Sequence, residues 1–154
     1  MSTVDPGELT AFERRVLDAC LDAPHPDLEA LRRQALGARV GTRTHTGVGA
    51  YLDLVVAEDA PRASNPGFAI GDVDLSVRDV AQGVATILYV VDGALKFIEF
   101  AAHDGAWPQV PELLDIGYVR EVDVGNGVWS LVPTKTRDPA TLARALAPRA
   151  RADA

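Results

Sequence analysis

The chain has 154 residues, of which 47% are hydrophobic, and a formal net charge of −7. This length and composition fit one domain with one hydrophobic core. The acidic charge argues against a nucleic-acid-binding surface, which needs clustered Lys and Arg to replace phosphate counterions. The longest apolar run, Val84–Val91, is too short to span a membrane, for which about 18 apolar residues are needed.

Two helices are predicted at the N-terminus. Apolar residues recur every three or four positions from about Glu8 to Ala23, and again from Leu28 to Ala35. The link between them is short, which favours an antiparallel pair of helices. Cys20 lies in the first apolar stripe and is the only cysteine, so we expect a buried thiol and no intrachain disulfide. Residues 1–10 lack the pattern of a signal peptide, and we expect a cytoplasmic protein.

Strands are predicted from residue 40 onward, where the spacing of apolar residues changes toward two. A threonine-rich strand over residues 40–46 suits the edge of a sheet, and a second strand is expected over 48–56. Prolines and small polar residues predict a loop over residues 58–67. A further strand is expected over residues 68–77.

This last strand contains a change of phase. Its apolar residues stand at even positions up to Ile70 and at odd positions from Val73 onward. One extra residue must be absorbed, and we predict a β-bulge at Gly71. Bulges re-aim side chains and are enriched near functional sites, so Asp72 becomes a candidate binding residue together with Asp74.

A β-hairpin is predicted over residues 84–100, because Asp92-Gly93 favours a type I′ turn between two β-prone runs. Counting outward from this turn sets Thr86 opposite Glu99 on an otherwise apolar face. Burial there would raise the pKa of the carboxyl, so Glu99 is the sharpest candidate for a general acid or base. The competing interpretation is an ordinary cross-strand pair with Thr86.

A corner and a second hairpin follow. His103 and Trp107 stand in the turn-rich corner, where Trp107 either anchors a partner or closes the core. Two further strands, over residues 118–124 and 128–132, flank a Gly-Asn-Gly link.

The chain ends in a basic tail. Residues 134–154 are rich in Ala, Arg and Pro and are expected to be partly helical or disordered. Asp138 and Pro139 favour a short helix over residues 140–147. Residues 1–133 carry 10 basic and 20 acidic side chains, whereas the tail carries 5 and 2, so the body is acidic and the tail is basic.

Four short motifs occur in order along the chain: Thr46-Gly47-Val48-Gly49, Gly71-Asp72-Val73, Asp92-Gly93 followed by Ile98-Glu99, and Trp107-Pro108. Their order and spacing resemble a family of small uncharacterised bacterial proteins. In that family an N-terminal helical segment precedes the motifs T-G-V-G, G-D-V, D-G, L-E-G and W-P. The resemblance covers about residues 8–110 and implies no activity, and Phe100 stands where the family has the glycine of L-E-G.

The sequence lacks the common catalytic motifs. His25, His45 and His103 lie in separate segments without an H-x-x-x-H pair, so we expect no metal site. The chain has no nucleophile elbow and no glycine-rich phosphate loop, so we expect no cofactor. Enzymatic activity stays open, with Glu99, Asp72 and His103 as the candidate catalytic residues.

Together these patterns predict an α+β fold, in which two N-terminal helices pack on one face of a mainly antiparallel sheet of five to seven strands. Residues 1–133 are expected to form a single domain, and residues 134–154 its tail. The pattern does not define an oligomeric state.

For function, the acidic body and the missing catalytic motifs favour a non-enzymatic intracellular protein-interaction module. It would bind a protein with a basic surface through Trp107, Asp72 and Asp74, as an immunity-type protein neutralises a toxin. Neither nucleic acid nor a membrane is expected as a partner. The alternative is a small-molecule-binding protein or enzyme, whose pocket between helices and sheet uses Glu99 with Asp72 or His103.

Overall fold

Two helices come first in the chain, as predicted. In the computed structural model, which describes residues 7–148, α1 spans Ala11–Cys20 and α2 spans Pro26–Leu36. α1 begins at a capping box, in which the side chains of Thr10 and Glu13 each accept a hydrogen bond from the other's backbone N–H. α2 has a proline at its first position, where a backbone N–H is not needed, and ends at Gly37.

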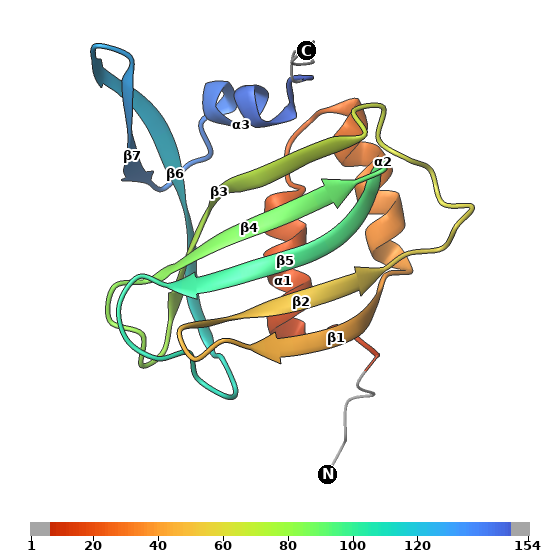
Figure 1. Cartoon of the computed structure of the whole chain (residues 1–154), viewed down its shortest axis with the longest axis horizontal. Coiled ribbons are helices and arrows are strands. Elements are labelled where there is room, and N and C mark those ends of the chain that lie inside the picture. Colours follow the sequence, from red (N-terminus) through yellow and green to blue (C-terminus); the bar gives the residue numbers. More distant parts are fainter. Residues whose placement is uncertain (1–6, 149–154) are drawn as a thin grey trace, which may run out of the picture.

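The strands of residues 7–148 form one antiparallel sheet. They are β1 (Arg39–His45), β2 (Gly49–Val55), β3 (Gly67–Val77), β4 (Val84–Val91), β5 (Ala94–Ala102), β6 (Leu113–Gly125) and β7 (Val128–Thr134). Their order across the sheet is β1-β2-β5-β4-β3-β6-β7, and every neighbouring pair is antiparallel (Figure 1). The prediction of an α+β fold with an antiparallel sheet is confirmed.

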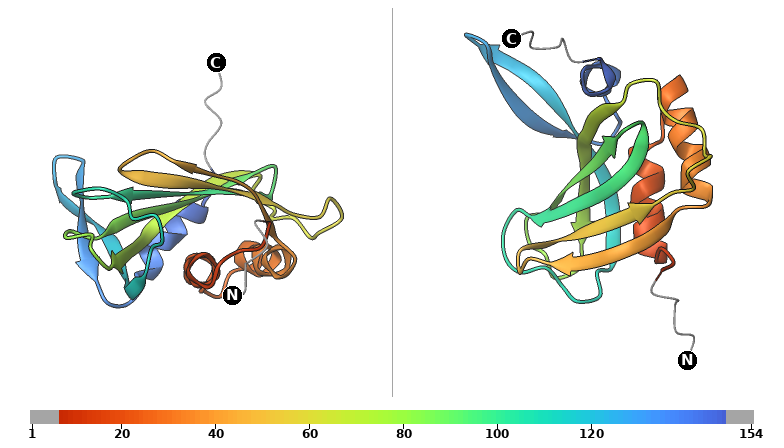
Figure 2. Two further views of the ribbon diagram at one scale, coloured as in Figure 1. Left: turned by 90° about the horizontal axis from the view of Figure 1, so that it is seen from below. Right: turned by 45° about the vertical axis from the view of Figure 1, so that its right-hand side comes forward.

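A third helix, α3 (Pro139–Leu146), follows the sheet in the described part of the chain. α1 contacts β3 and β6, α2 contacts β5, and α3 contacts β3. Figure 2 shows the sheet from its edge, with α1 and α2 below it. The prediction that the helices on the sheet are the two N-terminal ones is therefore wrong, because the C-terminal α3 also packs on the sheet.

α3 forms within the segment that the sequence assigned to a tail. Asp138 caps it by accepting hydrogen bonds from the backbone N–H and the hydroxyl of Thr141. Leu142 and Leu146 are buried, and their burial stabilises a short alanine-rich helix that would be marginal alone in water. Residues 149–154 of the predicted tail lie outside the described residues.

The core lies between the helices and the inner face of the sheet. Its largest fully buried side chains come from the N-terminal helical segment and from β2 to β5: Val16, Leu17, Leu21, Leu28, Leu31, Leu52, Ile70, Val73, Leu75, Leu88, Leu95 and Ile98. Each contributes about 1.5–3 kcal/mol through the area it removes from water. The core therefore ties one face of the sheet to the helices.

A buried glutamine fixes the central hairpin to α2. Gln34 Nε2 donates to the carbonyls of Pro61 and Gly93 at 2.6 and 2.9 Å, and its Oε1 accepts from the N–H of Leu95 at 2.9 Å. Asp92 and Gly93 both have positive φ, as a type I′ turn requires. The predicted turn is confirmed, and α2 holds it in place.

Candidate functional site

Asp72 is buried at the β-bulge that the sequence predicted. The pairing of β3 with β4 shifts between Ile70 and Val73, so Gly71 and Asp72 together stand opposite Ile87. The extra residue lets Asp72 and Val73 both turn to the side of the sheet that carries the helices, where both are buried. The bulge thus places a carboxylate in the core.

Arg137 neutralises this buried carboxylate. Its Nε and Nη2 each donate to one oxygen of Asp72 at 2.8 Å, which makes a bidentate ion pair. The same guanidinium donates to the carbonyls of Ala19, Cys20 and Asp22 at the C-terminal end of α1. Because carbonyls at a helix end need partners outside the helix, Arg137 caps α1 while it pairs with Asp72. The geometry gives Asp72 a structural role.

Two further side chains, Cys20 and Tyr118, lie beside this ion pair. Burial raises the pKa of the Cys20 thiol to about 12, against the opposing effect of the Arg137 charge. The thiol is therefore protonated and unreactive at neutral pH, in agreement with the sequence interpretation. The ring of Tyr118 lies 5.5 Å from the Arg137 guanidinium and packs on it.

Glu99 does not lie opposite Thr86, so the predicted register is wrong beyond the second pair from the turn. A bulge at Lys96 sets Tyr89 opposite Phe97, where simple counting placed Lys96. Every later residue of β5 is displaced by one position. Because side chains alternate along a strand, this shift moves Glu99 to the other face of the sheet.

Glu99 instead lies between two tyrosines. Its neighbours along β5, Ile98 and Phe100, are buried in the core, so Glu99 points to the opposite face of the sheet. No helix of the described chain covers that face (Figure 2).

The neighbours of Glu99 on the adjacent strands are Tyr51 and Ile87. Tyr51 Oη donates to Glu99 Oε2 at 3.2 Å, and Tyr89 Oη donates to Oε1 at 3.3 Å. The ring of Phe97 stacks on Tyr89 at 4.3 Å and meets Tyr51 edge-on at 6.0 Å. We call Tyr51, Tyr89, Phe97 and Glu99 the Glu99 patch.

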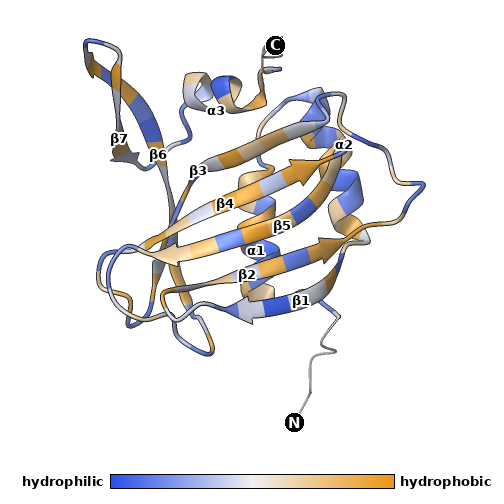
Figure 3. Cartoon of the chain, in the orientation of Figure 1, coloured by the Kyte–Doolittle hydropathy of each residue, from blue (hydrophilic) through white to orange (hydrophobic). Residues whose placement is uncertain are grey.

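The electrostatics of the Glu99 patch keep both phenols protonated. The negative charge of Glu99 and its hydrogen bond raise the pKa of Tyr51. The pKa of Tyr89 is raised by burial first and by the Glu99 charge second. Hydrophobic and hydrophilic residues alternate along the strands around the patch (Figure 3). A carboxylate among three aromatic rings, on an uncovered face, is suited to bind a cation.

Asp74 and His103 form a separate pair at another part of the sheet. His103 Nε2 lies 2.8 Å from Asp74 Oδ1, and both side chains are partly exposed. His103 therefore bonds to Asp74 and not to Glu99, while Asp72 lies on the face opposite to Glu99. The structure therefore brings together neither of the pairs that the sequence suggested for catalysis, Glu99 with Asp72 or Glu99 with His103.

Trp107 closes one end of the core. It is 9% exposed, its ring stacks on Phe100 at 5.3 Å, and its edge meets Phe12 at 6.2 Å. Its backbone N–H donates to the carbonyl of Gly47. This packing accounts for Trp107 as a core residue, and its use as a partner anchor stays a prediction.

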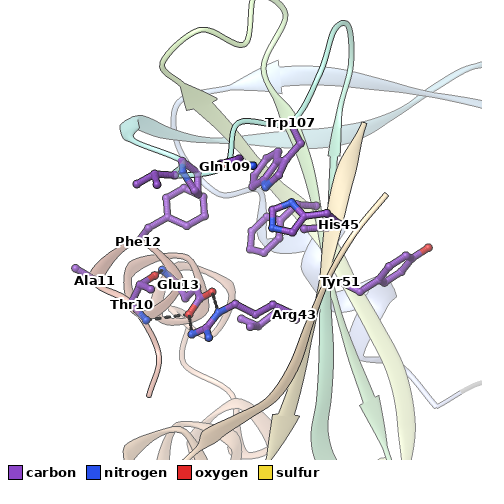
Figure 4. A pocket seen from close by; sticks show the side chains of 14 residues that line it. Thr10, Ala11, Phe12, Glu13, Arg43, His45, Tyr51, Trp107 and Gln109 are labelled. Atoms are coloured by element: carbon purple, nitrogen blue, oxygen red, sulfur yellow. Dashed lines mark hydrogen bonds and ion pairs between the residues drawn. The ribbon is translucent and has the colours of Figure 1, made fainter. Parts of the chain in front are cut away.

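A cleft of about 360 Å³ lies beside Trp107, between the start of α1 and the β1–β2 end of the sheet. Phe12, Phe100 and Trp107 form much of its apolar wall. Glu13 and Arg43 lie at its base, joined by two contacts of 2.8 Å. Figure 4 shows these side chains around the hollow, with Tyr51 pointing away on the far side of the strands. Glu99, Asp72 and His103 do not line this cleft.

Comparisons with known proteins add no assignment. No family model, curated protein or solved structure matches the chain, so the family resemblance stays a prediction. Within residues 7–148, no group of three or more His, Cys, Asp or Glu side chains is placed to hold a metal ion. Across the same residues, no helix is long and apolar enough to cross a membrane.

The sequence alone does not predict Tyr51, Tyr89 and Phe97 as neighbours of Glu99. Tyr51 belongs to another hairpin and reaches Glu99 only through the pairing of β2 with β5. The charge of Glu99 could have indicated the correct register. A carboxylate that falls on an otherwise apolar face of a strand suggests that a bulge shifts it to the other face.

We predict that Arg137→Ala strongly destabilises the fold. The substitution leaves Asp72 buried without a counterion, and such losses cost about 3–5 kcal/mol. Urea unfolding of the full chain measures the change. Arg78→Ala is the matched control, because the pair of Arg78 with Glu112 is exposed and should contribute at most about 1 kcal/mol. Equal effects of the two substitutions would contradict the assignment.

We predict that Glu99→Gln lowers the pKa of both Tyr51 and Tyr89 toward the ordinary tyrosine value. The substitution removes the negative charge that disfavours a second anion nearby. NMR titration of the tyrosine rings measures each pKa. Tyr118 serves as the internal control, because its raised pKa comes mainly from burial. Unchanged values for Tyr51 and Tyr89 would show that Glu99 does not act on them.

Proposed function

We propose that the chain is a non-enzymatic protein-interaction module, which binds a partner with a basic surface on the uncovered face of its sheet. The observation that carries this proposal is the Glu99 patch. Its carboxylate is positioned by two phenol donors on a face that no described helix covers. Exposed apolar and aromatic surface on a soluble protein is typical of a binding site.

The chemistry of the patch favours an arginine or lysine side chain as the group that binds. A guanidinium can stack on aromatic rings and donate to a carboxylate at the same time. Asp53, beside this patch on β2, adds a second carboxylate and accepts a hydrogen bond from Thr42. The acidic body attracts a basic partner over longer distances and raises the rate of encounter.

The most concrete form of this proposal is an immunity-type protein that covers a basic surface of a toxin. We place the protein in the cytoplasm, where its free and buried Cys20 fits a reducing environment. Neither nucleic acid nor a membrane is a partner in this proposed role. Glu99 and its aromatic neighbours bind the partner protein, whereas Asp72 belongs to the core.

We predict that the Glu99 patch binds an arginine-containing peptide. The probe is a capped Gly-Arg-Trp-Arg-Gly peptide, and its control carries citrulline in place of arginine. NMR titration should show saturable shifts at Tyr51 and Tyr89 with the first peptide only. Glu99→Gln should weaken binding about fivefold or more, since an exposed cation and its partners contribute about 1 kcal/mol.

Glu58→Gln is the matched control, because it removes the same charge from an exposed loop position. If Glu58→Gln and Glu99→Gln weaken binding equally, the binding depends only on the net charge of the protein, and a site at Glu99 is contradicted. The citrulline peptide binding as well as the arginine peptide would contradict recognition of a cation.

A second candidate function is the binding of a small apolar molecule in the cleft beside Trp107. The cleft volume falls within the usual range of ligand pockets, about 300–1,000 Å³. Its charged pair, Glu13 and Arg43, is bonded internally, so the cleft offers mainly apolar surface, which includes the rings of the three aromatic residues named above. This function needs a ligand that is flat and uncharged.

We predict for this second candidate that p-cresol shifts the indole N–H signal of Trp107 in a saturable way. The other tryptophan, Trp129, is exposed and provides the internal control, because its signal should stay unchanged. Trp129→Phe assigns the two signals. Shifts of equal size at both indoles would indicate nonspecific association and would exclude the cleft as the site.

A further inference from the structure

The hairpin of β6 and β7 extends beyond the rest of the sheet (Figure 1). β6 pairs with β3 only from Leu113 to Tyr118, and from Val119 onward it pairs with β7 alone. A two-stranded ribbon is marginally stable in water without further packing. The outer part of this hairpin therefore depends on other contacts.

α3 supplies contacts along the β6 side of the ribbon. The N–H of Glu121 donates to Thr141 Oγ1 at 3.0 Å, which occupies a backbone donor at the β6 edge. Arg144 Nε lies 2.9 Å from the Glu121 carboxylate, and the Arg144 guanidinium lies 4.8 Å from the Trp129 ring. Along residues 7–148, no strand pairs with the outer edge of β7.

The composition of β7 is unusual for a strand in this position. Edge strands of natural proteins commonly carry charges, prolines or bulges that discourage pairing with another chain. The opposite edge, β1, has two arginines and a shift of register. β7 reads Val-Trp-Ser-Leu-Val-Pro-Thr and has no charge; Trp129 and Leu131 are 52% and 63% exposed. The β7 edge is thus open to pairing along the five residues before Pro133.

We propose that β7 pairs antiparallel with β7 of a second copy of this chain, which joins the two sheets into one. Pro133 lacks an N–H and limits the pairing to residues 128–132. A twofold axis then passes beside Ser130, the middle residue of this segment. Trp129 of each copy lies opposite Leu131 of the other, and Val128 lies opposite Val132. The strand is complementary to itself, because every apolar residue meets an apolar residue.

Charge also favours a second copy at this edge. The chain has a net charge of −7, so most surfaces of two copies repel one another. β7 is neutral and brings no like charges directly opposite. The nearest acidic row, Glu121 and Asp123, lies on β6 next to Leu131 and Trp129. It is separated from the corresponding row of the other copy by about three strand spacings, roughly 14 Å, beyond the screening length of about 8 Å.

This arrangement has a consequence for the Glu99 patch. A dimer carries two Glu99 patches, one on each copy, at positions related by the twofold axis. The dimer is therefore bivalent for a partner that binds this patch. The pairing itself rests on β7 and does not depend on the proposed binding of a cationic partner.

Sedimentation equilibrium of the full chain, from micromolar to near-millimolar concentration, tests the pairing. We expect the mass to rise with concentration to twice the chain mass of 16.4 kDa. Ser130→Glu places two carboxylates opposite each other at the axis and should raise the dissociation constant about tenfold or more. Ser130→Lys should do the same. A mixture of the two variants should restore dimers, because the opposed charges then attract.

Val124→Glu is the matched control, because it adds the same charge at an exposed position of β6 and should leave the dimer intact. Circular dichroism of each variant confirms that the monomer is folded. A wild-type chain that stays monomeric throughout overturns the proposal, as does a dimer unaffected by Ser130→Glu. Failure of the mixture to restore dimers overturns the axis at Ser130. A mass above the dimer would indicate open-ended assembly and would equally exclude a closed twofold pair.

Discussion

The ion pair of Asp72 with Arg137 is the interaction on which the arrangement of the other elements depends. Arg137 has five N–H donors in a fixed plane, and it uses them on a β3 carboxylate and on three carbonyls at the end of α1. One buried side chain therefore connects the sheet, the first helix and the segment before α3. Because Arg137 follows β7 in the chain and binds Asp72 of β3, the chain must turn back toward β3 after β7. The helix that follows, α3, therefore packs beside β3.

The ion pair in turn requires the bulge at Gly71. Without the extra residue, a strict alternation after Ile70 would bury Asp72 while turning Val73 and Leu75 outward, whereas both are almost fully buried. The bulge lets the chain keep Asp72 inside and still bury the later apolar residues. A local irregularity of β3 thus provides the site for a long-range contact, between residues 65 positions apart.

The two bulges show which parts of the fold the sequence could predict. Around Gly71 the apolar residues change from even to odd positions, and the bulge predicted from this change is confirmed. The second bulge, at Lys96, has no such signal, because the residues from Leu95 to Phe100 are apolar on both faces apart from Lys96 and Glu99. Counting residue pairs from the turn therefore did not predict this bulge. Its consequence is that Thr86 lies in the core opposite Phe100, with no hydrogen-bond partner for its Oγ1 among the described residues.

Local signals predicted the helices, the start of α3 at Asp138 and the type I′ turn, because each depends on residues within a few positions of one another. The strand order and the partner of Asp72 depend on contacts between distant segments, and no spacing in a single sequence encodes them. The packing of α3 belongs to the same class, since its alanine-rich sequence forms a stable helix only where Leu142 and Leu146 find a surface.

The resulting sheet separates the contacts that stabilise the fold from the proposed binding surfaces. Its inner face carries the apolar core, Gln34 and the Asp72–Arg137 pair, where single changes affect folding. Its outer face carries the Glu99 patch, where the phenol hydrogen bonds of 3.2 and 3.3 Å orient a carboxylate without burying it. The β7 edge is distinct from both, because its free groups are backbone groups. Substitutions at Glu99 and at Ser130 therefore address the proposed binding and the proposed assembly, while Asp72 and Arg137 continue to hold the fold.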